Sequence, residues 1–117
     1  MKTDMDKRGI NNIVNHAQVS EKAIERYLVE KVKSWGGICL KYSNPGMVGY
    51  PDRLILLPGG CVMWVELKSK GKKPTKLQTI RHRELESLGQ YIATIDSRDG
   101  VDNLEVVYNN WKQEHEL

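Results

Sequence analysis

Cysteine and histidine are scarce in this chain, and long apolar runs are missing. The 117 residues include two cysteines and three histidines. Two cysteines are too few for a disulfide scaffold, and because both lie in apolar runs we expect Cys39 and Cys61 to be reduced packing residues. The three histidines are scattered, which excludes the ligand spacing of a structural zinc site. No apolar run approaches the ~20 residues of a membrane-spanning helix, and no signal-peptide segment follows the charged start, so we expect a soluble, cytoplasmic protein.

The composition is that of one globular domain. Hydrophobic residues make up 39% of the chain and charged residues 28%, which argues against disorder. The length is close to the commonest domain size. Residues 1–19 are polar and are expected to form an N-terminal tail or a short extra helix. Residues 20–117 are expected to form a single domain.

The spacing of apolar residues predicts a mixed α/β fold. Apolar residues at helical spacing after Ser20, a good N-cap residue, predict a first helix over residues 21–35. The turn sequence 58–60, Pro-Gly-Gly, joins two apolar runs and is typical of a hairpin. A final helix is expected to begin at Asp99 and to run to about Gln113. The other expected elements are strands over 38–42, 53–57, 61–68 and 91–95 and a second helix from Thr75 to Gly89. The order is therefore α-β-β-β-α-β-α, with a central mixed β-sheet flanked by helices.

Basic residues are concentrated in one segment. The net charge of the whole chain is +3, but residues 68–83 hold no acidic residue, and the other 101 residues carry 11 basic and 15 acidic side chains. A cationic stretch on an otherwise acidic body indicates contact with a polyanion, usually nucleic acid, although a solvated lysine-rich loop has the same composition. The seven basic residues are Lys68, Lys70, Lys72, Lys73, Lys76, Arg81 and Arg83.

Two carboxylates and a lysine interrupt the apolar strands of the predicted hairpin. Asp52 precedes the first of these strands, and Glu66 and Lys68 lie two residues apart at the end of the second. Asp52 and Glu66 are equally far from the turn centre at Gly59, so we expect them to lie opposite each other, with Cβ atoms ~4.5–5.5 Å apart. A divalent cation would relieve their repulsion, and oxygen ligands favour Mg²⁺ or Mn²⁺ over zinc. The alternative is an ordinary cross-strand ion pair on an exposed edge.

These residues lie in a longer string that resembles a known nuclease family. Asp52 after a proline, followed later by Glu-Leu-Lys, resembles the PD-(D/E)XK nuclease signature, and the wider pattern resembles the VRR-NUC family of virus-type replication and repair nucleases. The resemblance implies a restriction-endonuclease-like core and a magnesium-dependent DNA endonuclease, and small stand-alone members are similar to Holliday-junction resolvases. It covers residues 21–96. The matching segments are Gly49-Tyr50-Pro51-Asp52-Arg53, Leu57-Pro58-Gly59-Gly60, Val65-Glu66-Leu67-Lys68, Gly71-Lys72 and Gln78.

The resemblance also implies further members of the metal site. The Leu67 carbonyl would join Asp52 and Glu66, together with a glutamate of the first helix. Both Glu21 and Glu25 are candidates for that position. We favour Glu25, because it lies beside the buried stripe, where an unpaired charge is costly, whereas the helix dipole already explains a carboxylate in the first turn. Lys68 would orient or activate the attacking water.

Two residues of the second helix have competing interpretations. Gln78 matches the glutamine of the family, but with Thr75 it also forms the pattern of a capping box. His82, four residues later, would face the same cleft or be a solvated or phosphate-contacting side chain.

In the loop before Asp52, Met47 and Tyr50 would wedge against a DNA base step or simply pack within the loop.

The predicted function is that of a metal-dependent, structure-selective DNA endonuclease that resolves four-way (Holliday) junctions. The alternatives are a flap or single-strand nuclease, and a non-catalytic nucleic-acid-binding module on the same fold. The binding module is disfavoured because Asp52, Glu66 and Lys68 are all present. No small-molecule cofactor is expected, and the resemblance suggests a phage protein in the cytoplasm of a bacterial host. The residues expected to contact DNA phosphates without reading sequence are Lys70, Lys72, Lys73, Lys76 and Arg81.

A homodimer is expected, because a four-way junction needs two symmetric incisions and the chain has room for one active site. Two predicted helices carry apolar residues beyond those needed for the core, which would supply the interface. These residues are Tyr27, Val29 and Trp35 in the first helix and Val106, Val107, Tyr108 and Trp111 in the final segment.

Overall fold

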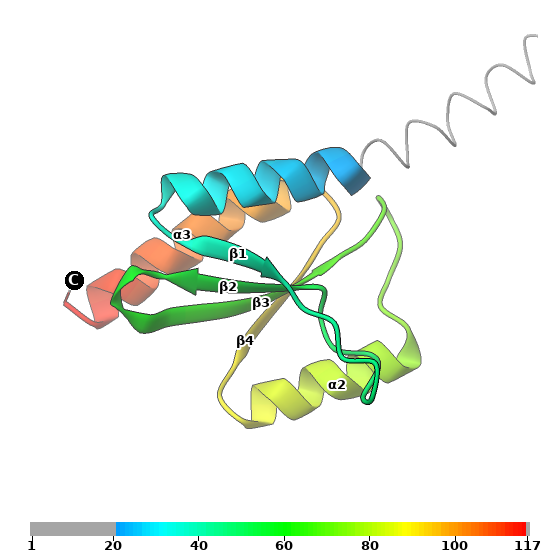
Figure 1. Cartoon of the computed structure of the whole chain (residues 1–117). Helices are drawn as coiled ribbons and strands as arrows, with labels where there is room; N and C mark the ends of the chain where they lie inside the picture. Colours follow the sequence, from blue (N-terminus) through cyan, green and yellow to red (C-terminus); the bar gives the residue numbers. More distant parts are fainter. Residues whose placement is uncertain (1–20, 117) are drawn as a thin grey trace, which may run out of the picture.

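The computed structural model describes residues 21–116, so the predicted tail or short helix at residues 1–19 lies outside the described residues. The N-terminal helix is described over residues 21–34. The predicted order α-β-β-β-α-β-α is confirmed (Figure 1). The later elements are β1 (Ile38–Lys41), β2 (Arg53–Leu57), the 3₁₀ turn η1 (Pro58–Gly60), β3 (Cys61–Leu67), α2 (Lys76–Ser87), β4 (Tyr91–Ile95) and α3 (Arg98–Glu114).

The four strands form one mixed sheet in the order β1-β2-β3-β4. The strands β1, β2 and β3 pair antiparallel, and β4 pairs parallel with β3. A parallel neighbour cannot be reached by a tight turn, and α2 provides the crossover from β3 to β4. The β2–β3 register pairs Arg53 with Val65, so Asp52 and Glu66 face each other across the hairpin, as the sequence predicts.

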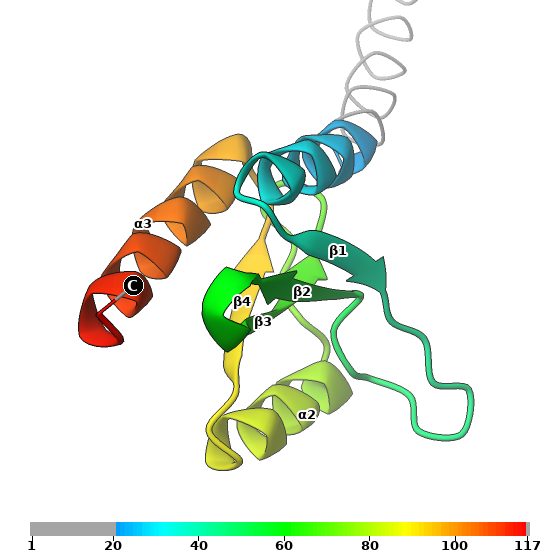
Figure 2. The same cartoon turned by 60° about the vertical axis from the view of Figure 1, so that its left-hand side comes forward.

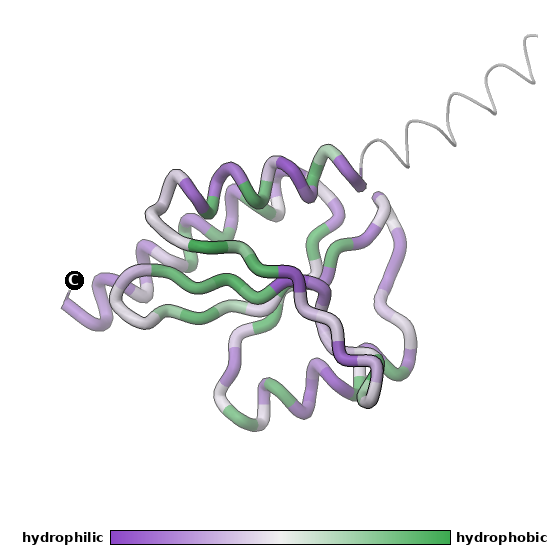
Figure 3. Tube along the Cα trace, in the orientation of Figure 1, coloured by the Kyte–Doolittle hydropathy of each residue, from purple (hydrophilic) through white to green (hydrophobic). Residues whose placement is uncertain are grey.

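Helices cover both faces of this sheet. The N-terminal helix and α3 lie on one face and α2 on the other (Figures 1 and 2). Figure 3 shows that the hydrophobic residues concentrate on the strands and alternate along the helices. Alternate residues of β3 point to opposite faces of the sheet. Met63, Val65 and Leu67 point into the main core, whereas Glu66 points to the side of α2. Both cysteines are unpaired; Cys61 is buried in the core and Cys39 packs against it, as predicted.

The helix ends follow local hydrogen bonding, with one correction. The predicted capping box is present at α2: the Thr75 hydroxyl accepts from the Gln78 N–H, and the Gln78 Oε1 accepts from the Thr75 N–H. The N-cap of α3 is Ser97 and not Asp99, because the Ser97 hydroxyl accepts from the Gly100 N–H at 3.1 Å. Asp99 lies within the first turn, where a carboxylate also stabilises the helix. Among the described residues, no helix is long and apolar enough to cross a membrane.

Most of the apolar residues expected to form an interface are used inside the molecule. Tyr27 packs against the core and donates its hydroxyl hydrogen to Asp102 of α3. Tyr108 is buried, and its hydroxyl donates to the Pro58 carbonyl at 3.2 Å. Trp35, Val107 and Trp111 pack against the core as well. The prediction that these seven residues form surplus apolar surface is therefore wrong for five of them. These five pack against the core because the N-terminal helix and α3 lie over the same face of the sheet.

Candidate active site

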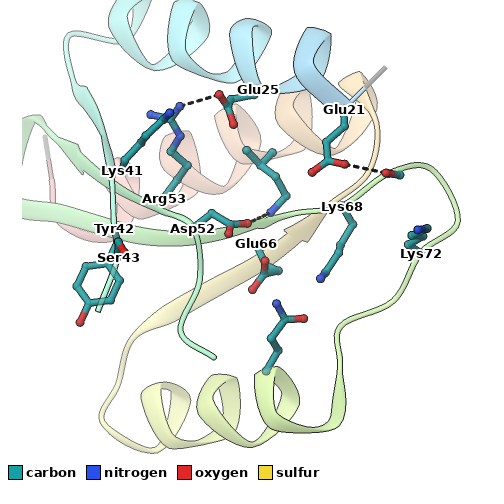
Figure 4. A pocket seen from close by; sticks show the side chains of 13 residues that line it. Glu21, Glu25, Lys41, Tyr42, Ser43, Asp52, Arg53, Glu66, Lys68 and Lys72 are labelled. Atoms are coloured by element: carbon teal, nitrogen blue, oxygen red, sulfur yellow. Dashed lines mark hydrogen bonds and ion pairs between the residues drawn. The ribbon is translucent and has the colours of Figure 1, made fainter. Parts of the chain in front are cut away.

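An open pocket of about 470 Å³ lies where the N-terminal helix, the ends of β1 and β3 and the start of α2 meet. Every residue expected to act in the chemistry or to hold the metal lines it, although these residues are spread over 54 positions of the sequence. They are Glu25, Asp52, Glu66, Leu67, Lys68 and Gln78. Figure 4 shows the side chains of Glu25, Asp52, Glu66 and Lys68 around this pocket.

Asp52 lies at the mouth of the pocket on the residue that precedes β2. Its side chain is exposed, and its Oδ2 accepts the Leu67 N–H at 2.9 Å, which ties it to the end of β3. Its own carbonyl accepts the Tyr42 N–H at 2.7 Å from the end of β1. The backbone of two neighbouring strands therefore holds this carboxylate in place.

Glu66 is the buried partner of Asp52. Its side chain is 1% exposed, and its Oε1 has no hydrogen-bond partner. Burial, the adjacent Asp52 carboxylate and the Glu21 carboxylate raise the pKa of Glu66 to about 8, and the Lys68 ammonium group offsets part of that shift. A buried carboxylate without a partner is costly, so this position favours a neutral acid or a bound cation.

His82 of α2 lies on the far side of Glu66. Its Nε2 is 3.5 Å from the Glu66 Oε1, and it is the second buried side-chain atom in residues 21–116 without a hydrogen-bond partner. Burial lowers the pKa of the His82 imidazole. The expectation of a solvated or phosphate-contacting histidine is therefore wrong, because α2 packs this ring onto the outer face of β3 and away from solvent.

The structure separates the two glutamates of the N-terminal helix. Glu25 pairs with the Arg53 guanidinium at 3.1 Å, whereas the Glu21 carboxylate accepts the Ser69 hydroxyl at 2.7 Å. The preference for Glu25 rests on the cost of an unpaired charge beside the core, and the ion pair with Arg53 removes that reason. Glu21 is the helix carboxylate whose field reaches Glu66.

Arg53 is a residue of the pocket that the sequence reasoning missed. It is 7% exposed, and besides Glu25 it contacts the Cys39 carbonyl at 3.3 Å. A charged residue inside an otherwise apolar strand, directly after Asp52, was the available signal. It could not be interpreted because the partner on the N-terminal helix is 28 residues away in sequence.

Gln78 closes the capping box and also lines the pocket. Of the residues expected to contact phosphates, Lys72 lines the pocket. Lys70, Lys73 and Lys76 are exposed and lie within four residues of Lys72 in the sequence. Arg81 has a different position. Its guanidinium bonds to the Val48 carbonyl and to Glu84, and it lies over the Tyr50 ring.

The chemistry of this pocket suits a hard divalent cation. The Asp52 and Glu66 carboxylates and the Leu67 carbonyl are oxygen donors, and the buried Glu66 carboxylate, whose Oε1 accepts no hydrogen bond, carries the charge that such a cation would compensate. Over residues 21–116 no three His, Cys, Asp or Glu side chains come together as a ready metal cluster. The protein would therefore supply few ligands, as is usual for Mg²⁺, which keeps several waters.

Comparison with known proteins identifies the family. No family model matches the chain. The phage protein "Putative nuclease p44" of Acyrthosiphon pisum secondary endosymbiont phage 1 is 43% identical over 81 residues, which cover 69% of this chain and 87% of that protein. A solved structure described as a VRR_NUC domain matches with a TM-score of 0.72 and 31% identity, over 76% of this chain and 97% of that one. The fold, the signature residues gathered in one pocket and these two relatives show that the chain belongs to the VRR-NUC family of nucleases.

Proposed function

We propose that this protein is a metal-dependent endonuclease that hydrolyses phosphodiester bonds of DNA. The observation that carries the proposal is the buried Glu66, whose Oε1 has no hydrogen-bond partner, next to Asp52 at the edge of a pocket with a lysine. The charged form of such a carboxylate destabilises the fold unless a bound cation compensates it or a proton neutralises it. A cation in this pocket and the basic residues beside it would both attract a negatively charged phosphate group, so the site suits a phosphate substrate.

The residues of the pocket suggest a division of roles. Asp52, Glu66 and the Leu67 carbonyl would hold Mg²⁺, or Mn²⁺ in its place, with Glu21 or Glu25 contributing from the N-terminal helix. Such a cation, when bound, polarises a phosphoryl oxygen and lowers the pKa of a water. The Lys68 ammonium group would orient that water and stabilise the charge that develops on the phosphate.

The preferred DNA is proposed to be a four-way junction, and the protein is proposed to act in the cytoplasm of a bacterial host, in keeping with the phage origin of its relative. A panel of labelled four-way junctions, flaps, single strands and plain duplexes, at one salt concentration, tests this with Mg²⁺ and with EDTA. The expected result is paired incisions across the junction in Mg²⁺ and no cleavage in EDTA. Cleavage of flaps or single strands with intact junctions would support the alternative nuclease. Binding without any cleavage would support the non-catalytic module.

The proposed homodimer needs an apolar surface, and the outer face of the sheet carries one. Ile38 and Leu40 of the edge strand β1 are 58% and 43% exposed, and Leu56 and Val62 are each 38% exposed. Ile38 pairs with Leu56, and Leu56 pairs with Val62, so these three side chains form one row across three strands, and Leu40 lies two residues along β1 on the same face. We therefore place the expected interface on this row and not on the N-terminal helix and α3.

Charge on this face is expected to separate the protomers. Ile38→Asp combined with Leu40→Asp should give a folded monomer, because burying unpaired carboxylates in an apolar interface is costly. Light scattering at micromolar concentration measures the change against wild type. Val106→Asp, at a 54% exposed position of α3, is the matched control and should leave the dimer intact. A wild-type monomer, free and bound to DNA, would contradict the dimer.

Removing charge from the basic loop is expected to weaken DNA binding equally for all sequences. Lys70, Lys72 and Lys73 are exposed on a loop that the Gly71 N–H anchors to Asp96 at 3.0 Å. Their triple replacement by alanine should reduce the slope of log K against log salt by about 0.9 for each lost phosphate contact. Lys33→Ala, at the opposite end of the N-terminal helix from the pocket, is the control. An unchanged slope would identify the loop as solvated surface.

A further inference from the structure

The loop between β1 and β2, residues 42–52, presents an apolar tip to solvent. Met47 and Val48 at the tip are 46% and 59% exposed. No charged residue occurs between Lys41 and Asp52. Figure 2 shows the loop projecting from the sheet on the side of α2. The tip thus carries no cationic side chain that would attract a phosphate group, in contrast to the basic loop at residues 69–74.

This loop is braced along its whole length. The Asn44 Oδ1 accepts the N–H groups of Gly46 and Met47 at 3.2 and 3.1 Å, which closes a local turn. The Arg81 Nε donates to the Val48 carbonyl at 3.1 Å from α2. Hydrogen bonds to the backbone of Met47 and Val48 therefore hold the tip in place.

Two further contacts join the loop to α2. The Tyr50 hydroxyl donates to Glu84, and the Arg81 guanidinium lies over the Tyr50 ring. Gly49 has φ +97°, and an added Cβ there would lie 2.8 Å from the Leu77 side chain. The backbone at residue 49 therefore packs directly on α2, which only glycine allows. Arg81, which is expected to contact DNA, braces this loop.

The tip lies next to the candidate active site. A hollow of about 240 Å³ follows the inner side of the loop, and its lining includes Met47, Val48 and Tyr50. Tyr42 and Ser43 line both this hollow and the pocket that contains Asp52 and Glu66. The pocket is thus bordered by a basic loop on one side and by a rigid, uncharged, apolar loop on the other.

We propose that Met47 and Val48 form a wedge that packs against nucleobases unstacked at a branch point of the DNA, while the basic loop holds the phosphates. This proposal rests on the proposed function. Exposed apolar side chains on a rigid support match the faces of unstacked bases, and proteins that kink DNA use such residues to part a base step. A plain duplex hides these faces, so the wedge would make the enzyme selective for branched substrates.

The test uses the full chain carrying Asp52→Asn, so that DNA binds without being cut. Four-way junctions are prepared with 2-aminopurine, an adenine analogue that brightens when it loses stacking, either at the branch or in an arm. Binding should raise the fluorescence at the branch and leave that in the arm unchanged. Adding Met47→Ser and Val48→Ser should abolish the rise and reduce the preference for junction over linear duplex by roughly tenfold. Val106→Ser, at a similarly exposed position of α3, should change neither.

An unchanged fluorescence rise and an unchanged preference in the double serine variant would overturn the wedge. If this variant loses affinity for junction and duplex equally, the loop contributes to binding without selecting branches, and the proposal is also wrong. If the Asp52→Asn parent binds none of the DNAs, the proposed function itself fails, and the wedge fails with it. Circular dichroism of each variant establishes that the fold is intact.

Discussion

Asp52→Asn and Glu66→Gln are each expected to abolish DNA cleavage while the protein stays folded and binds DNA. Each change replaces a carboxylate by an amide of the same size and removes one of the two acidic side chains of the candidate metal site. Metal sites supply several kcal/mol of transition-state stabilisation, and each ~1.4 kcal/mol is a factor of ten, so the rate should fall by about 10³-fold or more. Single-turnover cleavage of a labelled junction in Mg²⁺ measures the loss.

Two comparison variants make this result specific. Glu114→Gln removes an exposed carboxylate at the end of α3 and should cleave at the wild-type rate. Lys68→Ala should lose most of its activity and still show stabilisation by Mg²⁺ in thermal unfolding, because the lysine acts on the water or the phosphate and not on the cation. If Asp52→Asn or Glu66→Gln cleaves at a rate near that of wild type, the assignment of the site is wrong.

Glu66→Gln is also expected to stabilise the metal-free protein at alkaline pH. The pKa of Glu66 is about 8 in the folded protein, against an ordinary value of 4.5. Between these values the folded state binds more protons than the unfolded state, so the free energy of unfolding falls as the pH rises through this window. The loss is complete above pH 8 and is on the order of 5 kcal/mol, roughly 20 °C in Tm for a domain of this size.

The comparison is made in EDTA between pH 5 and pH 9. His82 has the opposite effect below its ordinary pKa of 6.5, since its lowered pKa makes the folded protein gain stability as the pH rises there. Glu66→Gln retains His82, whose Nε2 lies 3.5 Å from the Glu66 Oε1, so the difference between wild type and variant reports Glu66 together with its coupling to His82. That difference should grow in favour of the variant from pH 5 to pH 9, and Glu114→Gln should follow wild type.

Mg²⁺ provides the complementary measurement. At pH 8 it should raise the Tm of wild type and leave that of Glu66→Gln unchanged, because a ligand that binds only the folded state stabilises it in proportion to its affinity. Parallel pH profiles of wild type and variant would show that Glu66 is not held at a raised pKa. Equal stabilisation of both proteins by Mg²⁺ would place the cation elsewhere.

Local chemistry made most of the secondary structure predictable. The hairpin is an example: its turn lies symmetrically between Asp52 and Glu66, so their opposition follows from counting residues, and the observed register agrees. The Thr75–Gln78 capping box is likewise a contact between residues three apart. The N-cap of α3 was misplaced by two residues because serine and aspartate are equally good caps, and only the backbone conformation at Ser97 decides between them.

Periodicity and contacts across one short hairpin were enough to predict the fold class, the family resemblance and the grouping of Asp52, Glu66 and Lys68. The partners of these residues depend on how elements distant in sequence pack on one another. Three contacts join elements far apart in the chain. Glu25 pairs with Arg53, His82 contacts Glu66, and Arg81 donates to the Val48 carbonyl in the loop between β1 and β2. Periodicity shows which face of a helix is apolar, but the packing of one element on another determines which charges meet.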